Sequence, residues 1–125
     1  MTSIFASDAF AGQVVLITGA TSGIGAGTAR AFAANGASVM LNGRHADRGL
    51  AVRDAIRSSG GTAELSVGDV ANSSYCDSLV DQTVQRYGRV DVLFNNAGIV
   101  VNSRIEDMDD TTWGHLIDTN LMCPL

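Results

Sequence analysis

The chain contains one glycine-rich segment, TGATSGIG at residues 18–25, directly after the apolar run Val14–Thr18. Gly19 can turn the chain sharply, Gly23 lets the backbone approach a pyrophosphate, and Gly25 allows close packing of a helix on a strand. The first turn of a following helix would offer free N–H groups and a positive dipole end to phosphates. No lysine follows these glycines, which excludes a Walker A loop. We therefore predict a dinucleotide phosphate site at this turn.

Three further polar motifs follow in order along the chain. The glycine segment alone also fits simple turn chemistry, since glycine often marks strand ends. The same chain, however, carries Asp69-Val70, then Asn95-Asn96-Ala97-Gly98, and then Asn120-Leu121. Together with the Gly-x-x-x-Gly-x-Gly spacing of the first motif, this ordered set resembles the short-chain dehydrogenase/reductase family over residues 12–125.

The resemblance implies a cofactor-binding role for most of the matching residues. Asp69 matches the acid that contacts the adenine amino group, and Val70 is expected beside the adenine ring. Asn96 matches an asparagine near the ribose, while Thr21 and Ser22 are expected to be hydroxyl donors inside the loop. The expected cofactor-binding residues are Gly19, Thr21, Ser22, Gly23, Ile24, Gly25, Arg44, Asp69, Val70, Asn96, Ala97 and Gly98.

Two other matches have different implied roles. Asn95 matches a structural position that braces the central sheet. Asn120 matches the family's catalytic asparagine, whose backbone in a kinked helix holds a water of the proton relay. A simpler interpretation stays open: Asp69 only caps the next helix, and Asn95 and Asn96 only satisfy loop backbone groups.

The end of the second expected strand indicates which cofactor is preferred. A dinucleotide fold that prefers NAD places an acid about 20 residues after the glycine loop, on the ribose 2′-hydroxyl. Here Gly43 stands in the place of that acid, and Arg44 follows it. A guanidinium can clamp a 2′-phosphate through two parallel hydrogen bonds, so NADP is the expected cofactor and Gly43→Asp should reverse the preference. The alternative is that Arg44 is a solvated loop residue paired with Asp47.

The catalytic pair of the family is absent from this chain. The family reaction needs a tyrosine with a lysine four residues later. In this sequence Tyr75 is followed at that spacing by Leu79, Tyr87 is followed by Asp91, and no lysine occurs. We expect an NADP-dependent oxidoreductase of alcohols or ketones in a full-length form, and no turnover by these 125 residues alone. The alternatives are a non-catalytic dinucleotide-binding module and an unstable truncated fragment.

Short apolar runs alternate with helical segments, a pattern typical of βαβ units and a parallel sheet. The expected strands are Val14–Thr18, Ser38–Asn42, Ala63–Val67 and Val90–Phe94, in the sheet order 3-2-1-4. The expected helices run over residues 22–35, 47–59 with Asp47 as N-cap, 73–87, and from about 110 onward. This predicts an α/β fold, a partial Rossmann domain over residues 1–125 that is truncated within the helix after the fourth strand.

Composition and charge limit the remaining function classes. The net charge is −5, and binding to a phosphate backbone needs clustered positive charge, so nucleic acid is not an expected partner. No apolar stretch approaches the roughly 20 residues of a membrane span, and the start of the chain lacks signal-peptide features. Two distant cysteines indicate reduced thiols and a cytoplasmic protein. The expected partners are a small alcohol or ketone and, for the full-length form, further copies of itself.

No metal site or histidine-based triad is expected. Asp107, Asp109 and Asp110 lie at an expected helix start, where the helix dipole favours acids. His45 follows Arg44, and His115 belongs to the last expected helix. Neither histidine has a serine or acid nearby in the sequence that suggests a triad.

Overall fold

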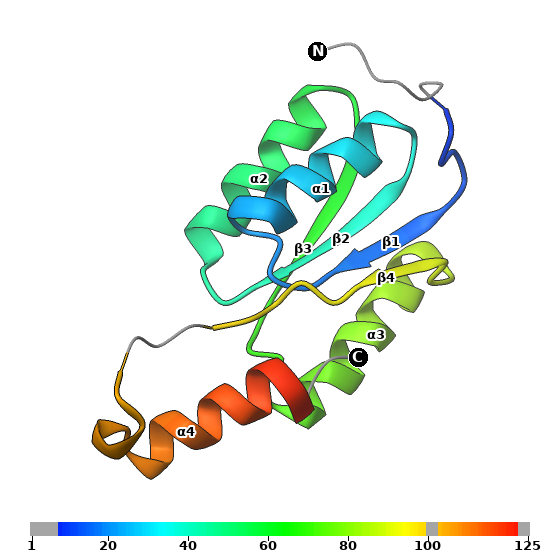
Figure 1. The fold of residues 1–125 in the computed structure, drawn as a ribbon. Coiled ribbons are helices and arrows are strands. Elements are labelled where there is room, and N and C mark those ends of the chain that lie inside the picture. Colours follow the sequence, from blue (N-terminus) through cyan, green and yellow to red (C-terminus); the bar gives the residue numbers. More distant parts are fainter. Residues whose placement is uncertain (1–7, 100–102, 123–125) are drawn as a thin grey trace.

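A computed structural model describes residues 8–99 and 103–122 of the chain. Its centre is a four-stranded parallel sheet in the order β3-β2-β1-β4 (Figure 1), which confirms the predicted order. The strands are β1 (Val14–Ile17), β2 (Ser38–Gly43), β3 (Thr62–Val67) and β4 (Val92–Phe94).

Helices connect the strands and cover both faces of the sheet. Helices α1 (Gly23–Ala34) and α2 (Ala46–Ser58) lie on one face, and α3 (Ser73–Tyr87) lies on the other (Figure 1). After β4 come a 3-10 turn (Ile105–Asp107), helix α4 (Asp110–Ile117), and a π-helical segment, η2 (Asp118–Met122). This arrangement is the expected α/β Rossmann-like architecture.

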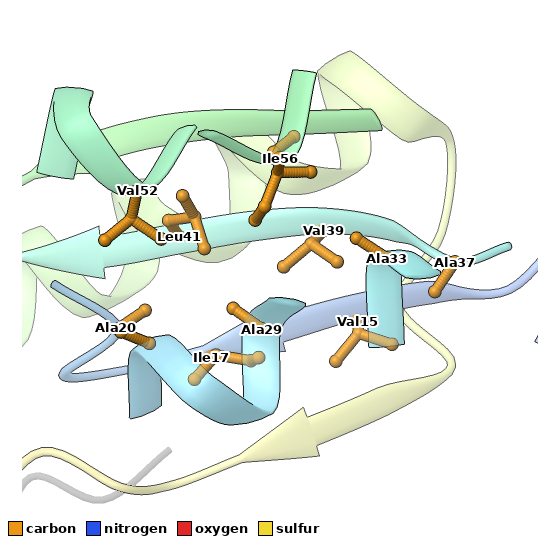
Figure 2. Close-up of a cluster of buried hydrophobic side chains, with 12 residues drawn as sticks. Val15, Ile17, Ala20, Ala29, Ala33, Ala37, Val39, Leu41, Val52 and Ile56 are labelled. Carbon is orange, nitrogen blue, oxygen red and sulfur yellow. The ribbon is translucent and has the colours of Figure 1, made fainter. Parts of the chain in front are cut away.

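Alternating side chains of the buried strands belong to two separate hydrophobic cores, one on each face of the sheet. Val15 and Ile17 of β1 pack with Val39 and Leu41 of β2 beneath α1 and α2 (Figure 2). On the opposite face, Leu16 packs in a second cluster with Cys76 and Leu79 of α3. Because successive strand residues point to opposite faces, a strand covered on both sides must be apolar throughout.

The first core has small residues where α1 meets the sheet. Ala29 and Ala33 face the strands (Figure 2), and Ala26 belongs to the same cluster. Short side chains bring the helix backbone close to the strands. This close approach places the first turn of α1 directly beyond the carboxyl end of β1.

The fourth strand is shorter than the sequence predicts. It begins at Val92 rather than Val90, because Asp91 caps the start of β1 instead of joining a regular ladder. The Asp91 N–H donates to the Val14 carbonyl at 2.9 Å, and the Val14 N–H donates to the Asp91 carboxylate at 2.7 Å. This exchange fixes the register of β1 and β4.

The N-cap of the second helix lies two residues before the predicted one. His45 is its N-cap, without a side-chain cap hydrogen bond, and Asp47 lies in the first turn. The prediction of Asp47 as the N-cap was therefore wrong, although an acid in the first turn still complements the helix dipole.

Over the described residues, the helices are too short or too polar to cross a membrane.

Candidate functional site

The carboxyl ends of the four strands meet at one edge of the sheet, as the parallel register requires. The loops that leave this edge enclose an open pocket. Its lining residues are Gly19, Thr21, Ser22, Asn42, Gly43, Arg44, His45, Arg48, Gly68, Asp69, Val70, Asn96, Ala97, Gly98, Ile99 and Thr119. The predicted loop residues Gly23, Ile24 and Gly25 shape the turn but do not line this pocket, and neither do Asn95 and Asn120.

The glycine loop needs its glycines for two different reasons. Gly19 and Gly23 adopt left-handed backbone conformations, with φ of +64° and +57°. Side chains other than glycine rarely adopt such angles. A Cβ atom on Gly25 would instead collide with the carbonyl oxygen of Gly19. Gly25 therefore serves close packing, as expected, but against the loop's own first glycine rather than against the strand.

The start of α1 is available to an anion. Ser22 is the N-cap in an extended conformation, yet its side chain makes no capping hydrogen bond. The first turn of α1 contains no acidic residue. The N–H groups at a helix start lack partners within the helix and carry the positive end of its dipole. This turn can therefore hold a phosphate group.

The segment after β4 is fastened to the glycine loop. The buried hydroxyl of Thr18 accepts hydrogen bonds from the N–H groups of Asn96 and Ala97, at 3.1 and 3.0 Å. The Asn96 Nδ2 atom donates to the Gly19 carbonyl at 3.0 Å. Asn96 thus lines the pocket and also braces the glycine loop.

A buried polar network lies beneath the pocket, and sequence reasoning missed it. Asn42 accepts from the Gly19 N–H at 3.4 Å and donates to the Gly68 carbonyl at 3.2 Å and to the Tyr75 hydroxyl at 3.1 Å. That hydroxyl lies 2.7 Å from Ser66 Oγ. The signal that could have revealed this network is Asn42, a polar residue near the end of the largely apolar strand β2. The network joins the glycine loop to the loop after β3.

The end of β2 is crowded on one side and cationic on the other. Gly43 is buried, and a Cβ atom there would collide with the side chain of Thr21. Arg44 is exposed and lines the pocket together with Arg48 of α2. Within the described residues no ion pair joins Arg44 to Asp47, in contrast to the alternative interpretation, whereas ion pairs do form at Arg53, Arg57, Arg86, Arg89 and Arg104.

Asp69 is held by two partners. Its Oδ1 atom accepts from the Ala71 N–H at 2.9 Å, and its Oδ2 atom lies 3.3 Å from Nε2 of His115. The sequence did not predict this acid beside His115, which the fold supplies from the loop after β3. Val70, next in the chain, is buried in the second core.

Helix α4 begins and ends at well-defined polar contacts. Asp109 caps its start by accepting from the Thr112 N–H at 2.6 Å, which lowers the pKa of the Asp109 carboxyl. At the other end, Asn120 lies in the π-helical segment. Its amide accepts from the N–H of Ile99 and donates to the carbonyl of Ile99, both at 2.8 Å. The side chain of Asn120 thus anchors the segment after β4, and its backbone belongs to the irregular π-helical segment.

Similarity to known proteins extends over nearly the whole chain. A model of the family described as short chain dehydrogenase matches residues 13–125. The chain belongs to the short-chain dehydrogenase family. Among curated relatives in this family, 3beta-hydroxysteroid dehydrogenase of Mediterraneibacter gnavus is 42% identical over 110 residues, which are 87% of this chain and 40% of that protein. Glucose 1-dehydrogenase of Gluconobacter oxydans is 43% identical over 102 residues, 81% of this chain and 38% of that protein.

Solved structures of short-chain dehydrogenases share the fold in detail. A metagenomic short-chain oxidoreductase in complex with NADP has a TM-score of 0.87 and 36% identity, and the match covers 92% of this chain and 52% of that one. A short chain dehydrogenase from Mycobacterium smegmatis has a TM-score of 0.89 at 36% identity, covering 98% and 52%. The chain therefore spans about two fifths of the length of the curated relatives named above and about half of these structures.

Proposed function

We propose that this chain supplies the cofactor-binding part of an NADP(H)-dependent short-chain oxidoreductase that acts on an alcohol or ketone. The observation that carries the cofactor choice is the end of β2. There the buried Gly43 leaves no carboxylate for a ribose 2′-hydroxyl, and the exposed guanidinium of Arg44 borders the pocket without an ion pair among the described residues. The NADP complex of a family member with 36% identity supports the same choice.

The residues present fit a dinucleotide along the length of the pocket. In this proposal the first turn of α1 and Ser22 bind the pyrophosphate, and the lack of a Cβ on Gly25 keeps the loop tight. Asp69 and Val70 bind the adenine, and Arg44 binds the 2′-phosphate. When bound, NADP(H) supplies the hydride that is exchanged with the substrate carbon.

We further propose that Asn120, in the π-helical segment after α4, contributes one group to a proton path. Asn120 uses its side chain on Ile99, so its backbone in the π-helical segment is left to hold a water. Neither tyrosine of this chain fits the role of proton donor. The Tyr75 hydroxyl is engaged by Asn42 and Ser66, and the Tyr87 hydroxyl is buried at the end of α3. We therefore propose that the 125 residues bind the cofactor without turnover, which also fits a non-catalytic binding module.

Titration calorimetry with NADP and NAD tests the cofactor choice. A hydrogen bond to an ionised group contributes about 1.5–3 kcal/mol, so we expect NADP to bind at least about tenfold more tightly than NAD. Arg44→Ala should remove most of this difference and leave NAD affinity nearly unchanged. Arg30→Ala is the matched control, because Arg30 is an exposed arginine on α1 outside the pocket. Equal affinities in the unmodified chain would overturn the proposal.

A further inference from the structure

Asn42 lies near the carboxyl end of β2, between two of the loops that border the pocket. Because β2 runs between β1 and β3 (Figure 1), its end meets the glycine loop on one side and the loop after β3 on the other. The Ala20 N–H donates to the Asn42 carbonyl at 2.7 Å. The Gly68 N–H donates to the Gly43 carbonyl at 3.0 Å. These two bonds use only the backbone, so they do not depend on which side chain stands at position 42.

The side chain of Asn42 adds a second connection between the same two loops. Its Oδ1 atom accepts from the Gly19 N–H at 3.4 Å, and its Nδ2 atom donates to the Gly68 carbonyl at 3.2 Å. The first bond needs an acceptor and the second needs a donor. Among side chains of this size only asparagine offers both, since ionised aspartate only accepts and leucine does neither. The amide therefore bridges the glycine loop and the loop after β3.

The surroundings of the amide fix its orientation. Asn42 is buried, and its Nδ2 atom also donates to the Tyr75 hydroxyl at 3.1 Å. That hydroxyl lies 2.7 Å from Ser66 Oγ, and the Tyr75 ring packs so closely on Gly68 that a Cβ atom there would collide with it. The reversed amide would place its nitrogen against the Gly19 N–H, donor against donor. The bridge is thus held in one arrangement by its own partners.

We propose that Asn42 is a positioning residue that couples the two loops, so that a ligand touching both binds more tightly than separate contacts would allow. This inference rests on the proposed function, in which the first turn of α1 meets the pyrophosphate and the loop after β3 meets the adenine. Loops that are already fixed relative to one another spare the ligand the cost of ordering them. Because protein groups engage the amide oxygen and nitrogen, Asn42 acts on the ligand through the loops.

Two ligands that differ by one phosphate test the coupling. Adenosine 2′-monophosphate carries the adenine and the 2′-phosphate, whereas 2′,5′-ADP adds a 5′-phosphate that can reach the first turn of α1. The ratio of their dissociation constants, from calorimetric titration, measures what the second contact adds. Asn42→Leu keeps the branched shape without the hydrogen bonds, and should reduce this ratio by about threefold to tenfold, the value of one neutral hydrogen bond. Affinity for adenosine 2′-monophosphate should stay within about twofold, because the Gly68–Gly43 backbone bond remains.

The ratio separates positioning from a loss of stability. A variant that only reduces the folded fraction lowers the apparent affinity for both ligands by the same factor and leaves the ratio unchanged. Tyr75→Phe is the matched control, since it removes hydrogen bonds from the same network but keeps the Asn42 contacts with Gly19 and Gly68. Its ratio should stay within about twofold of that of the unmodified chain. If Asn42→Leu does not fold, Asn42→Ser carries the same test, because its shorter side chain cannot reach both partners.

Three outcomes would overturn the inference and leave the proposed function standing. One is an Asn42 variant whose ratio equals that of the unmodified chain. Another is an equal fall of the ratio in Tyr75→Phe, which would mean that any disturbance of the network has this effect. The third is an unmodified chain that binds the two ligands equally well. An unmodified chain that binds neither 2′,5′-ADP nor NADP would remove the proposed function as well.

Discussion

The Nε2 atom of His115 lies 3.3 Å from the Oδ2 atom of Asp69, although the two residues are 46 positions apart in the chain. This contact joins α4, which has no buried residues, to the loop after β3. At the other end of the helical segment, Asn120 fastens the backbone of Ile99. Two polar attachments therefore position the helical segment that borders the pocket, and one of them involves the expected adenine-binding acid.

The His115 contact predicts a modest and chemically specific effect on binding. His115→Phe keeps a ring but removes the nitrogen that meets Asp69, so 2′,5′-ADP should bind about two- to fivefold more weakly, as for a partly exposed polar pair. His115→Gln places a donor amide at similar reach and should retain most of the affinity. Calorimetric titration of the three chains gives the comparison. The same loss in both variants would show that the contact does not position Asp69.

The Asp69–His115 pair illustrates what the sequence could not reveal. Periodicity and turn residues give the strands, their order and the glycine loop, because these depend on local patterns and on the right-handed connection of parallel strands. The pairing of two side chains from distant loops depends on helix placement instead. The shortening of β4 has a similar origin, since nothing local shows that Asp91 caps the start of β1.

Side-chain volume at the pocket is another feature that only the fold provides. From the sequence, Gly43→Asp should simply turn the preference from NADP to NAD. The structure places Thr21 where any Cβ on residue 43 would lie. If Gly43 sets the cofactor preference as we propose, this position also sets the packing, so the substitution alters both.

We predict that Gly43→Ala destabilises the chain. Overpacking of a buried position typically costs about 1–3 kcal/mol, and here the Thr21 side chain must move away from its place in the pocket wall. Gly27→Ala is the control, since a Cβ on this exposed helical residue meets nothing within 4 Å. It should raise stability by about 0.5–1 kcal/mol through its better helix propensity. Urea unfolding measures both changes, and a neutral Gly43→Ala would contradict the crowding.

The network beneath the pocket predicts a difference between the two tyrosines. Tyr75→Phe removes hydrogen bonds to Asn42 and Ser66 and leaves the buried Ser66 hydroxyl without this partner. We expect a loss of about 1–3 kcal/mol in unfolding free energy. Tyr87→Phe removes a hydroxyl that has no hydrogen-bond partner among the described residues and should be close to neutral or stabilising. Equal losses in the two variants, measured by urea unfolding, would argue against the network as a source of stability.

Asp91 predicts how stability depends on pH. The Arg89 side chain and the Val14 N–H donate to its carboxylate, and both hold the pKa of Asp91 below its ordinary value. Because the folded pKa is depressed, the Asp91 contribution is fully present above the ordinary carboxylate pKa of about 4 and is lost as the pH falls through the folded value. Protonation of Asp91 should therefore weaken its side-chain hydrogen bond to the Val14 N–H, at the start of β1, only at acidic pH.

Asp91→Asn tests this directly. The variant should be less stable than the unmodified chain at pH 7, and the difference should shrink as the pH falls below about 4, since protonation removes the same charge from the unmodified chain. Asp81→Asn on α3 is the control, because the Asp81 side chain is exposed and has no ion pair among the described residues. Thermal melting across this pH range gives the measurement. A deficit in Asp91→Asn that is the same at pH 7 and in acid would mean that shape, rather than charge, holds β1 against β4.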